Sequence, residues 1–373
     1  MPGPEVCARA AGPPGLGLRT FELEPEDSRW AEFTAGHPQA LPYHHPSWVR
    51  VLREAFGYSN ATLGCADSTG RLHGILPLLE KKSVLTGLRL SSLPHTPVAG
   101  PLASDASSLH ALLSAATERV DQGHVRWLQL KVSGAGLDAP MNGFSRLEWD
   151  PAYVLDLPGD QEDMRFGNSR HHSAISRAVR KAARLGVTVR PASSPADVRR
   201  WYRLYLETMR AHAIPPRPLR LFELMWEVLA PLDLLRLLLA ERQAGSQVRL
   251  LAGSLFLMHG QTVVFAFNGR DRSQLEFRPN DAIHWTAIMD ACASGFRRYD
   301  FGEATDGNPG LLAFKEKWGA KPVNLYRYHY PQLPGIERGI LASGSLQWAQ
   351  ECAWRLLPPA MTARMGRWVY RCL

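Results

Sequence analysis

The sequence predicts an α/β (α+β) protein built from two similar halves with mixed, mostly antiparallel sheets. At 373 residues, the chain exceeds the roughly 100 to 200 residues of a typical domain, which favours two domains. A helix-like segment that closes at a glycine and leads into a strand-like segment occurs twice, at residues 112–130 and 284–302. A strand-like run that crosses a central glycine also occurs twice, at residues 71–83 and 249–262. These repeats predict a duplicated fold.

The first half alternates strand-like and helical segments. Its predicted elements after a loose tail at 1–19 are a strand at 21–27, helices at 28–35 and 47–57, strands at 61–67 and 71–82, a helix at 107–123 and a strand at 125–133. In the second helix Trp48, Leu52 and Ala55 recur at helical spacing, and Gly57 ends it. The Ser-Thr-Gly turn between the two central strands predicts that they pair antiparallel.

The second half repeats this plan around a three-stranded meander. Its predicted elements are a strand at 187–191, helices at 195–212 and 219–230, strands at 233–242, 248–260 and 262–269, a helix at 281–295 and a strand at 297–303. Ser194 is predicted to cap the first of these helices, because Pro195 suits the first helical position. Turn residues separate the three central strands, as expected for a meander.

The composition argues against several classes of protein. The chain is 45% hydrophobic and 21% charged, which argues against disorder, and it lacks the apolar run of about 18 residues that spans a bilayer. No apolar stretch of the signal-peptide kind opens the sequence, so we expect a cytoplasmic location. Five widely spaced cysteines without a C-x-x-C pair indicate buried or idle thiols. The tandem pairs His44-His45 and His171-His172 cannot converge on one helix face, so no metal site is predicted.

Basic residues are concentrated in one segment. The net charge of +8 favours anionic partners such as nucleic acid, nucleotide-linked substrates or anionic lipid. Between residues 165 and 190 there are seven Lys or Arg and no acid. Those predicted to form one RNA-binding or anion-binding helix face are Arg170, Arg177, Arg180, Lys181 and Arg184. A solvated helix face is the other interpretation, and sparse aromatic residues give no sign of base stacking.

Three segments carry a resemblance to a known family. They are SRAVRKAARLGVTV at 176–189, RPNDAIHWTAIMDACASGFRRYDFGEAT at 278–305 and GLLAFKEKWGAKPVNLYRY at 310–328. Together they resemble the FemAB family and the related CelD-like acetyltransferases. The most specific match is the DFG strand followed about 14 residues later by F-K-x-x-W-G. The resemblance implies two tandem GNAT-like acyltransferase domains.

The resemblance also implies how the chain is divided. The expected parts are an N-terminal tail at 1–19, GNAT-like domains at 20–158 and 159–333, and an amphipathic helical tail at 334–373. The tryptophans and arginines of the last part suit contact with an anionic membrane surface, which would place the protein at the inner face of the membrane. Packing of this tail back onto the enzyme is the other interpretation.

Aminoacyl transfer is the leading hypothesis for the function. Members of the family transfer aminoacyl groups from aminoacyl-tRNA to peptidoglycan precursors, so the resemblance implies this donor, an amine of a cell-envelope precursor or small metabolite as acceptor, and no cofactor. The alternative is an acyl-CoA-dependent N-acyltransferase of polysaccharide biosynthesis, because the long coiled-coil arm of some Fem ligases is missing. A third hypothesis is a non-catalytic module that binds RNA or an envelope precursor.

Three residues near the family motifs are candidates for catalysis. Lys315 matches the lysine of the family's F-K-x-x-W-G motif, and a cation could stabilise the oxyanion of a tetrahedral intermediate. Asp300 or Glu303 could accept a proton from the attacking ammonium. Their opposite strand parities predict that they lie on different faces of the strand. The alternatives are a surface lysine, and an Asp300 that caps the loop or pairs with a neighbouring arginine.

Two further sets are candidates for substrate binding. The donor set lies at the start of the helix predicted at 281–295 and in the FKEKWG motif that follows it. It comprises Arg278, Asn280, Asp281, Phe314 and Trp318. A helix N-terminus can hold phosphate, although the glycine-rich loop of CoA-dependent enzymes is absent here. The acceptor set, which follows the family resemblance, comprises Tyr205, Thr208, Arg210 and Asn268. Helix capping by Asn280 or Asp281, and a core position for Tyr205, are the simpler interpretations.

Overall fold

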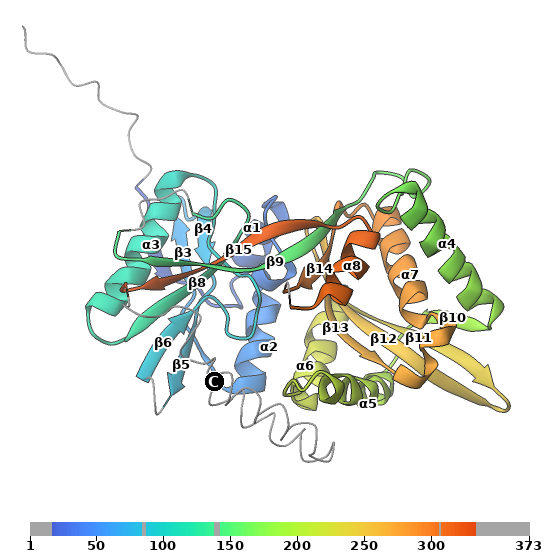
Figure 1. The fold of residues 1–373 in the computed structure, drawn as a ribbon. Helices are drawn as coiled ribbons and strands as arrows, with labels where there is room; N and C mark the ends of the chain where they lie inside the picture. Colours follow the sequence, from blue (N-terminus) through green and yellow to red (C-terminus); the bar gives the residue numbers. More distant parts are fainter. Residues whose placement is uncertain (1–16, 84–86, 138–141, 306, 333–373) are drawn as a thin grey trace, which may run out of the picture.

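The computed structural model describes residues 17–83, 87–137, 142–305 and 307–332. The predicted tail at 334–373 and most of the tail at 1–19 lie outside these residues. Two lobes face each other, and two long strands bridge them near the top of the view (Figure 1). Across these described ranges, no helix is both long and apolar enough to cross a bilayer.

The first lobe contains short strands and three α-helices. Its elements are β1 Arg19–Glu22, α1 Ser28–Gly36, η1 Pro42–His44, α2 Pro46–Phe56, β2 Ser59–Asn60, β3 Leu63–Ala66, β4 Leu72–Leu76, β5 Leu79–Ser83, β6 Gly87–Ser91, β7 Leu102–Ala103, α3 Ala106–Asp121, β8 Trp127–Ser133 and β9 Ser145–Asp156. The predicted helices are confirmed, and Gly57 ends α2 in the left-handed conformation with φ 75°.

The second lobe contains the longer strands. Its elements are α4 Ser169–Arg184, β10 Val187–Pro191, α5 Pro195–Ala211, α6 Leu219–Leu229, η2 Ala230–Leu232, β11 Leu235–Ala244, β12 Gln247–His259, β13 Thr262–Arg270, η3 Arg272–Phe277, α7 Pro279–Ala293, β14 Arg298–Glu303, α8 Pro309–Lys317 and β15 Lys321–Tyr330. The predicted antiparallel meander of β11, β12 and β13 is confirmed. Ser194 precedes α5 as expected, but its side chain forms no capping hydrogen bond.

The strands form one small and one very large sheet. The small sheet has the order β1-β3-β4-β7, and the large one runs β10-β11-β12-β13-β14-β9-β15-β8-β6-β5-β2 through both lobes. Strand β9, from the first half of the chain, pairs with β14 of the second half. Strand β15, near the end of the described chain, lies between β9 and β8. The two halves of the chain therefore share a continuous sheet.

Several strands differ from the sequence prediction. The run at 71–82 was expected to be one strand, but it divides at Pro77 into β4 and β5, which belong to different sheets. Proline lacks the N–H that a central strand needs, which explains the break. Strands β2, β6, β7, β9 and β15 were not predicted. In β9 and β15 the apolar residues are interrupted by charges and by Pro151 and Pro322, so neither strand shows a clear alternation.

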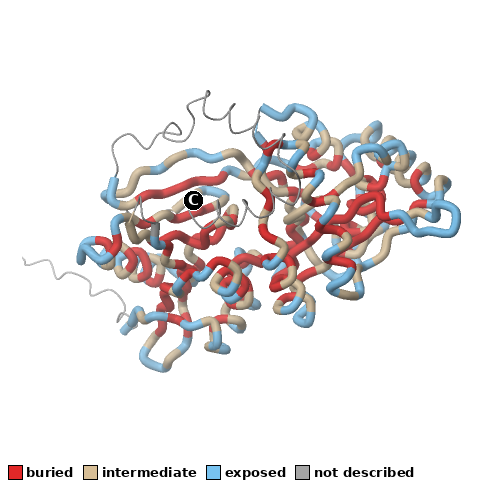
Figure 2. The backbone as a smooth tube through the Cα atoms, turned by 90° about the horizontal axis from the view of Figure 1, so that it is seen from below, coloured by how far each residue is buried: buried red, intermediate tan, exposed pale blue. Residues whose placement is uncertain are grey.

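The core of the second lobe forms where α5 lies on the meander. Trp201 is fully buried and donates a hydrogen bond from Nε1 to the carbonyl of Gly253 at 2.8 Å. Two glycines in the strands allow this close approach. A Cβ atom on Gly253 would lie 2.5 Å from Cδ1 of Trp201, and one on Gly269 would lie 2.6 Å from the backbone nitrogen of Tyr205. Buried segments run through the interior of both lobes (Figure 2), and the described cysteines, Cys65 and Cys292, are buried thiols as predicted.

We expect Gly269→Ala to destabilise the protein by about 1 to 3 kcal/mol, because the added methyl group overlaps the backbone of α5. Urea unfolding measures the change. The control is Gly36→Ala, whose methyl group would meet no atom within 4 Å. Equal stability of the two variants would contradict the tight contact between α5 and β13.

Candidate active site

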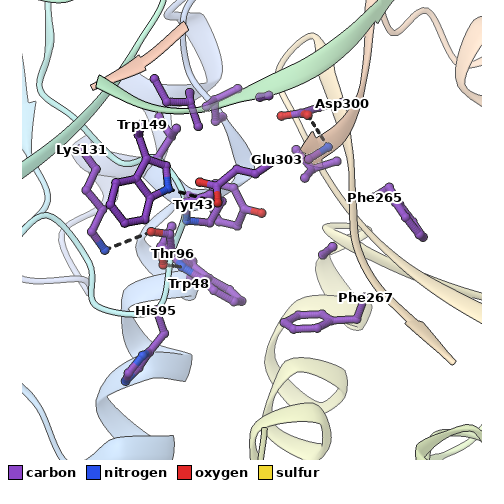
Figure 3. Close-up of a pocket in the computed structure, with 18 of the residues that line it drawn as sticks. Tyr43, Trp48, His95, Thr96, Lys131, Trp149, Phe265, Phe267, Asp300 and Glu303 are labelled. Carbon is purple, nitrogen blue, oxygen red and sulfur yellow. Dashed lines mark hydrogen bonds between the residues drawn. The ribbon is translucent and has the colours of Figure 1, made fainter. Parts of the chain in front are cut away.

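A cavity of about 480 Å³ lies where the two lobes meet, and residues of both lobes line it. From the second lobe come β13 residues 264–267 and, from β14, Asp300, Gly302 and Glu303. From the other elements come Tyr43, Trp48, His95, Lys131, Trp149 and Arg327. Figure 3 shows these groups around a common space, with Glu303 between Lys131 on one side and Asp300 on the other. The cavity thus depends on the contact between the lobes.

Asp300 and Glu303 both line this cavity, so the prediction that they lie on different faces is wrong. The reason is an irregularity in β14: its register against β9 shifts between Asp300 and Glu303. Gly302 has φ 77°, a conformation that glycine adopts without steric cost. The amide of Gly302 donates a hydrogen bond of 2.7 Å to Oδ1 of Asp300. A bulge of this kind cancels the alternation of a regular strand.

The environment of Asp300 makes its carboxyl group a weaker acid than an ordinary aspartic acid side chain. Burial raises the pKa of its carboxyl group to about 6, although the hydrogen bond from Gly302 and the nearby ammonium of Lys315 oppose this shift. Charged carboxylates lose solvation energy in a partly buried site, which favours the protonated form. A carboxylate with a pKa near neutrality is suited to accept a proton in catalysis.

Glu303 is held by two side chains. Its Oε1 accepts a hydrogen bond from Nη2 of Arg327 at 3.1 Å, and its Oε2 accepts one from Nε1 of Trp149 at 3.4 Å. Burial raises the pKa of Glu303, and the charge of Arg327 opposes that rise. The Arg327 guanidinium also lies 4.8 Å from the centre of the Trp149 ring. These contacts fix the carboxylate at the wall of the cavity.

Lys315 lies directly behind this wall. Its side chain is buried, with 2% exposure, and Nζ donates hydrogen bonds to the carbonyls of Gly302 at 2.8 Å and Glu303 at 2.7 Å. Burial lowers the pKa of Lys315 to about 8, while Asp300 opposes this shift. Lys315 does not line the cavity. Lys317 points elsewhere and pairs with Asp281 at 2.9 Å, so the two lysines lie on different helix faces as predicted.

The predicted donor residues lie around α7 and α8, outside the lining of the cavity. Trp318 is fully buried and packs against Phe166, with ring centres 4.9 Å apart. Phe314 packs 5.3 Å from the ring of His284. Asp281 is engaged by Lys317, as described above. Arg278 precedes α7 with φ 57° and forms no side-chain cap, whereas Oδ1 of Asn280 is buried without a hydrogen-bond partner.

The predicted acceptor residues also lie outside this lining. The hydroxyl of Tyr205 accepts a hydrogen bond from the amide of Arg217 at 3.0 Å, and its ring stacks on Trp201. Thr208 accepts from the amide of Arg270 at 3.0 Å. Asn268 accepts from the hydroxyl of Ser254 at 3.3 Å. Thr208 thus joins α5 to β13, whereas the bond of Asn268 lies within the meander and that of Tyr205 reaches the segment after α5. Arg210 also lies on α5.

The basic helix forms as expected but lies apart from the cavity. Helix α4 packs against α7 and β10. Of its predicted anion-binding residues, Lys181 is half-buried, and those that are exposed are Arg170, Arg177, Arg180 and Arg184. The basic residues therefore form a solvent-facing surface on the outer side of the second lobe (Figure 1).

Sequence reasoning missed the residues that the first lobe and β15 contribute. Lys131 and Arg327 each interrupt an otherwise apolar stretch of a strand, in WLQLKVS and NLYRYHY. Both side chains are nevertheless buried. A charged residue at an interior strand position is rarely buried unless it has partners, and this pattern could have indicated a site. Tyr43 and Trp48 lie before and at the start of α2, where Trp48 had been noted only for its helical spacing.

Comparisons with known proteins agree with this fold. Residues 169–316 match the family described as an acetyltransferase (GNAT) domain. The structure resembles the crystal structure of FemX with a TM-score of 0.65 and 16% sequence identity, covering 89% of this chain and all of that one. It also resembles L-PGS from Bacillus licheniformis, with a TM-score of 0.52, 11% identity, and coverage of 90% of this chain and 98% of that one.

Another similar structure is the C-terminal domain of a protein assigned as a lysylphosphatidylglycerol synthetase in Agrobacterium fabrum. Its TM-score is 0.54 at 10% identity, with 81% of this chain and 90% of that chain covered. No curated protein sequence matches the chain significantly. The domain match assigns residues 169–316 to an acetyltransferase (GNAT) domain, and the similar structures agree with this fold over most of the chain. The expected resemblance to the FemAB family is confirmed at the level of the fold.

We expect Asp300→Asn to stabilise the protein by about 2 to 3 kcal/mol at pH 7, since burial raises the pKa of Asp300 to about 6 and this rise opposes folding once the carboxyl group ionises. Between about pH 4 and pH 6, Asp300 is protonated in the folded protein but ionised in the unfolded chain. The free energy of unfolding of the wild-type protein therefore decreases as the pH rises through that window. Urea unfolding at several pH values should show a gap between the two proteins that grows up to about pH 6 and then stays constant. A gap independent of pH would contradict the burial of this charge, and Asp156→Asn, at an exposed residue of β9, serves as the control.

Proposed function

We propose that the protein is an amide-forming transferase that moves an aminoacyl group from aminoacyl-tRNA to an amine of a cell-envelope precursor or a small metabolite. The reaction would take place in the cavity between the lobes. The observation that carries this proposal is Asp300, a carboxyl group with a pKa of about 6 at the wall of that cavity.

Asp300 would act as the general base. An amine attacks the ester carbonyl as the neutral form, and the new C–N bond leaves a positive charge on nitrogen until a proton departs. Asp300 would accept that proton and return it to the leaving oxygen as the tetrahedral intermediate collapses, so that the ester C–O bond breaks and the tRNA hydroxyl is released. A base whose pKa lies near the working pH is efficient in such a transfer. Glu303 is less suited, because Arg327 and Trp149 already occupy its oxygens.

Lys315 would support this base from behind the wall. Its two hydrogen bonds fix the carbonyls of the bulge that brings Asp300 and Glu303 to one side. Its positive charge also favours the ionised form of Asp300. The geometry therefore favours a positioning role for Lys315 over direct contact with the oxyanion, because Lys315 does not line the cavity.

The basic surface of α4 supports aminoacyl-tRNA as the donor. Exposed arginines on one helix can neutralise several phosphates, each adding a salt-dependent increment to the affinity. The segment between β13 and α7, residues 271–278, contains no glycine, so it lacks the flexible phosphate cradle expected of a CoA-dependent enzyme. The name of the Agrobacterium fabrum protein describes an aminoacylated lipid as product, which is consistent with this chemistry.

Acyl-CoA is the second candidate donor. The domain match at 169–316 is to an acetyltransferase family. In addition, the parallel ladder between β13 and β14 ends at Val264 and Asp300. The backbone groups beyond that point can pair with the amides of an extended donor, as an added strand would.

The donor is tested by incubating the protein and a panel of amines with charged tRNA or with acetyl-CoA, each with and without ribonuclease. We expect amide product from charged tRNA that disappears after ribonuclease treatment. Product from acetyl-CoA that survives ribonuclease would transfer support to the second candidate. Salt-sensitive RNA binding without product from either donor would instead favour the non-catalytic module.

The pH dependence tests the base. Since Asp300 must be deprotonated to act, kcat/KM should fall tenfold per pH unit below about pH 6 and level off above it. Asp300→Asn should lower the rate about 100-fold to 10,000-fold and abolish this dependence. A variant that keeps the same acidic limb would show that another group is the base.

A further inference from the structure

The charges in the cavity are distributed unevenly. Asp300 lies on the side formed by the second lobe, with Lys131 on the opposite side (Figure 3). Lys131 belongs to β8, and Arg327, which also lines the cavity, belongs to β15. Glu303 lies between Asp300 and Lys131 in this view. A ligand that spans the cavity therefore meets an acidic group at one end and a cationic wall at the other.

Arg327 already has an acidic partner. Its Nη2 donates to Oε1 of Glu303 at 3.1 Å, and Nη1 donates to the carbonyl of Tyr326 at 3.4 Å. Trp149 occupies the second oxygen of Glu303. Each oxygen of Glu303 thus accepts one hydrogen bond from these side chains, and Lys131 acts on this carboxylate only through its charge.

Lys131 is buried beside this pair, with 7% exposure, and it lines the cavity. Its Nζ donates to the carbonyls of Leu93 at 2.7 Å and Thr96 at 3.0 Å. An ammonium group has three N–H donors, so one remains after these two contacts. Among the hydrogen bonds and ion pairs of the described residues, none joins Lys131 to a carboxylate. A buried cation in this situation lowers its energy when an anion binds.

We propose that the acceptor carries an anionic group, carboxylate or phosphate, besides its amine, and that the anion binds at Lys131 while the neutral amine faces Asp300. This inference rests on the proposed function and specifies its acceptor. Arg327 adds positive potential to the same wall. The two ends of the acceptor would be recognised by different strands, so the amine would be aligned with its base when the anion is bound.

The burial of Lys131 explains why the effect should be large. Burial and the neighbouring charge of Arg327 lower the pKa of Lys131 well below its usual value, while the charge of Glu303 opposes this shift. An anion at this position would restore the charged form and gain a charge-assisted hydrogen bond. Loss of a hydrogen bond to a charged group weakens binding about 10-fold to 100-fold.

The test compares amines that differ only in the anionic group, with whichever donor supports transfer. The pairs are O-phosphoethanolamine with ethanolamine, and β-alanine with β-alaninamide. We expect the wild-type protein to show a KM about 10-fold to 100-fold lower for the anionic member of at least one pair. The phosphate pair and the carboxylate pair distinguish the two sources of negative charge.

Lys131→Gln removes the charge but keeps an N–H donor for the two carbonyls, and we expect it to raise the KM of the anionic acceptor without raising that of the neutral one. Lys131→Arg should restore the preference. Lys321→Met, which removes an exposed lysine from β15, is the matched control. Equal KM values within both wild-type pairs, or an equal effect of Lys131→Gln on both members, would overturn the proposal.

Calorimetric titration of the same compounds, without any donor, separates this inference from the proposed function. Saturable binding of an anionic member that Lys131→Gln abolishes and Lys321→Met preserves would support the anion site even if no transfer occurs. Absence of binding by either anionic compound to the folded wild-type protein, together with absence of a KM preference, would overturn it. Circular dichroism establishes that each variant is folded.

Discussion

The hydrogen-bonded ladder that inserts β15 between β8 and β9 is the interaction on which the rest of the structure depends. It joins the strands of both lobes into one sheet. The cavity lies against this junction and takes Lys131 from β8, Trp149 from β9 and Arg327 from β15. Because main-chain hydrogen bonds fix the register of all three strands, the cationic wall has a defined position relative to the carboxylates of β14.

Two irregular features convert this sheet into a site. The bulge in β14 turns Asp300 and Glu303 to the same side, and Lys315 stabilises the bulge by filling two carbonyl acceptors. Buried polar groups are costly without partners, so each charge near the cavity is either bound by a neighbour or has a shifted pKa. Bulges commonly re-aim side chains beside functional sites. Here the re-aimed side chains include Asp300, whose pKa is raised by burial.

Much of the fold could be predicted from the sequence, whereas the assembly of the site could not. Helices such as α2 and α5 follow from periodicity and from their stop signals, and the meander follows from its turns. Strand β15 has no such pattern, because its burial comes from partners almost 200 residues away in the chain. The burial of Lys131 and Arg327 likewise depends on partners that are distant in the chain. Asp300 and Glu303 were found through the motif, but strand parity misplaced them because Gly302 allows a bulge.

The position of β15 also has a consequence for the order in which the protein is made. Its partner β8 ends at Ser133, yet Lys321 begins β15 only after both groups of helices have been synthesised. Until then the adjacent edges of β8 and β9 lack the strand that joins them. Contacts between such distant parts of a chain close slowly, and unpaired strand edges are prone to aggregate. The late arrival of this strand makes completion of the central sheet a late event on the ribosome.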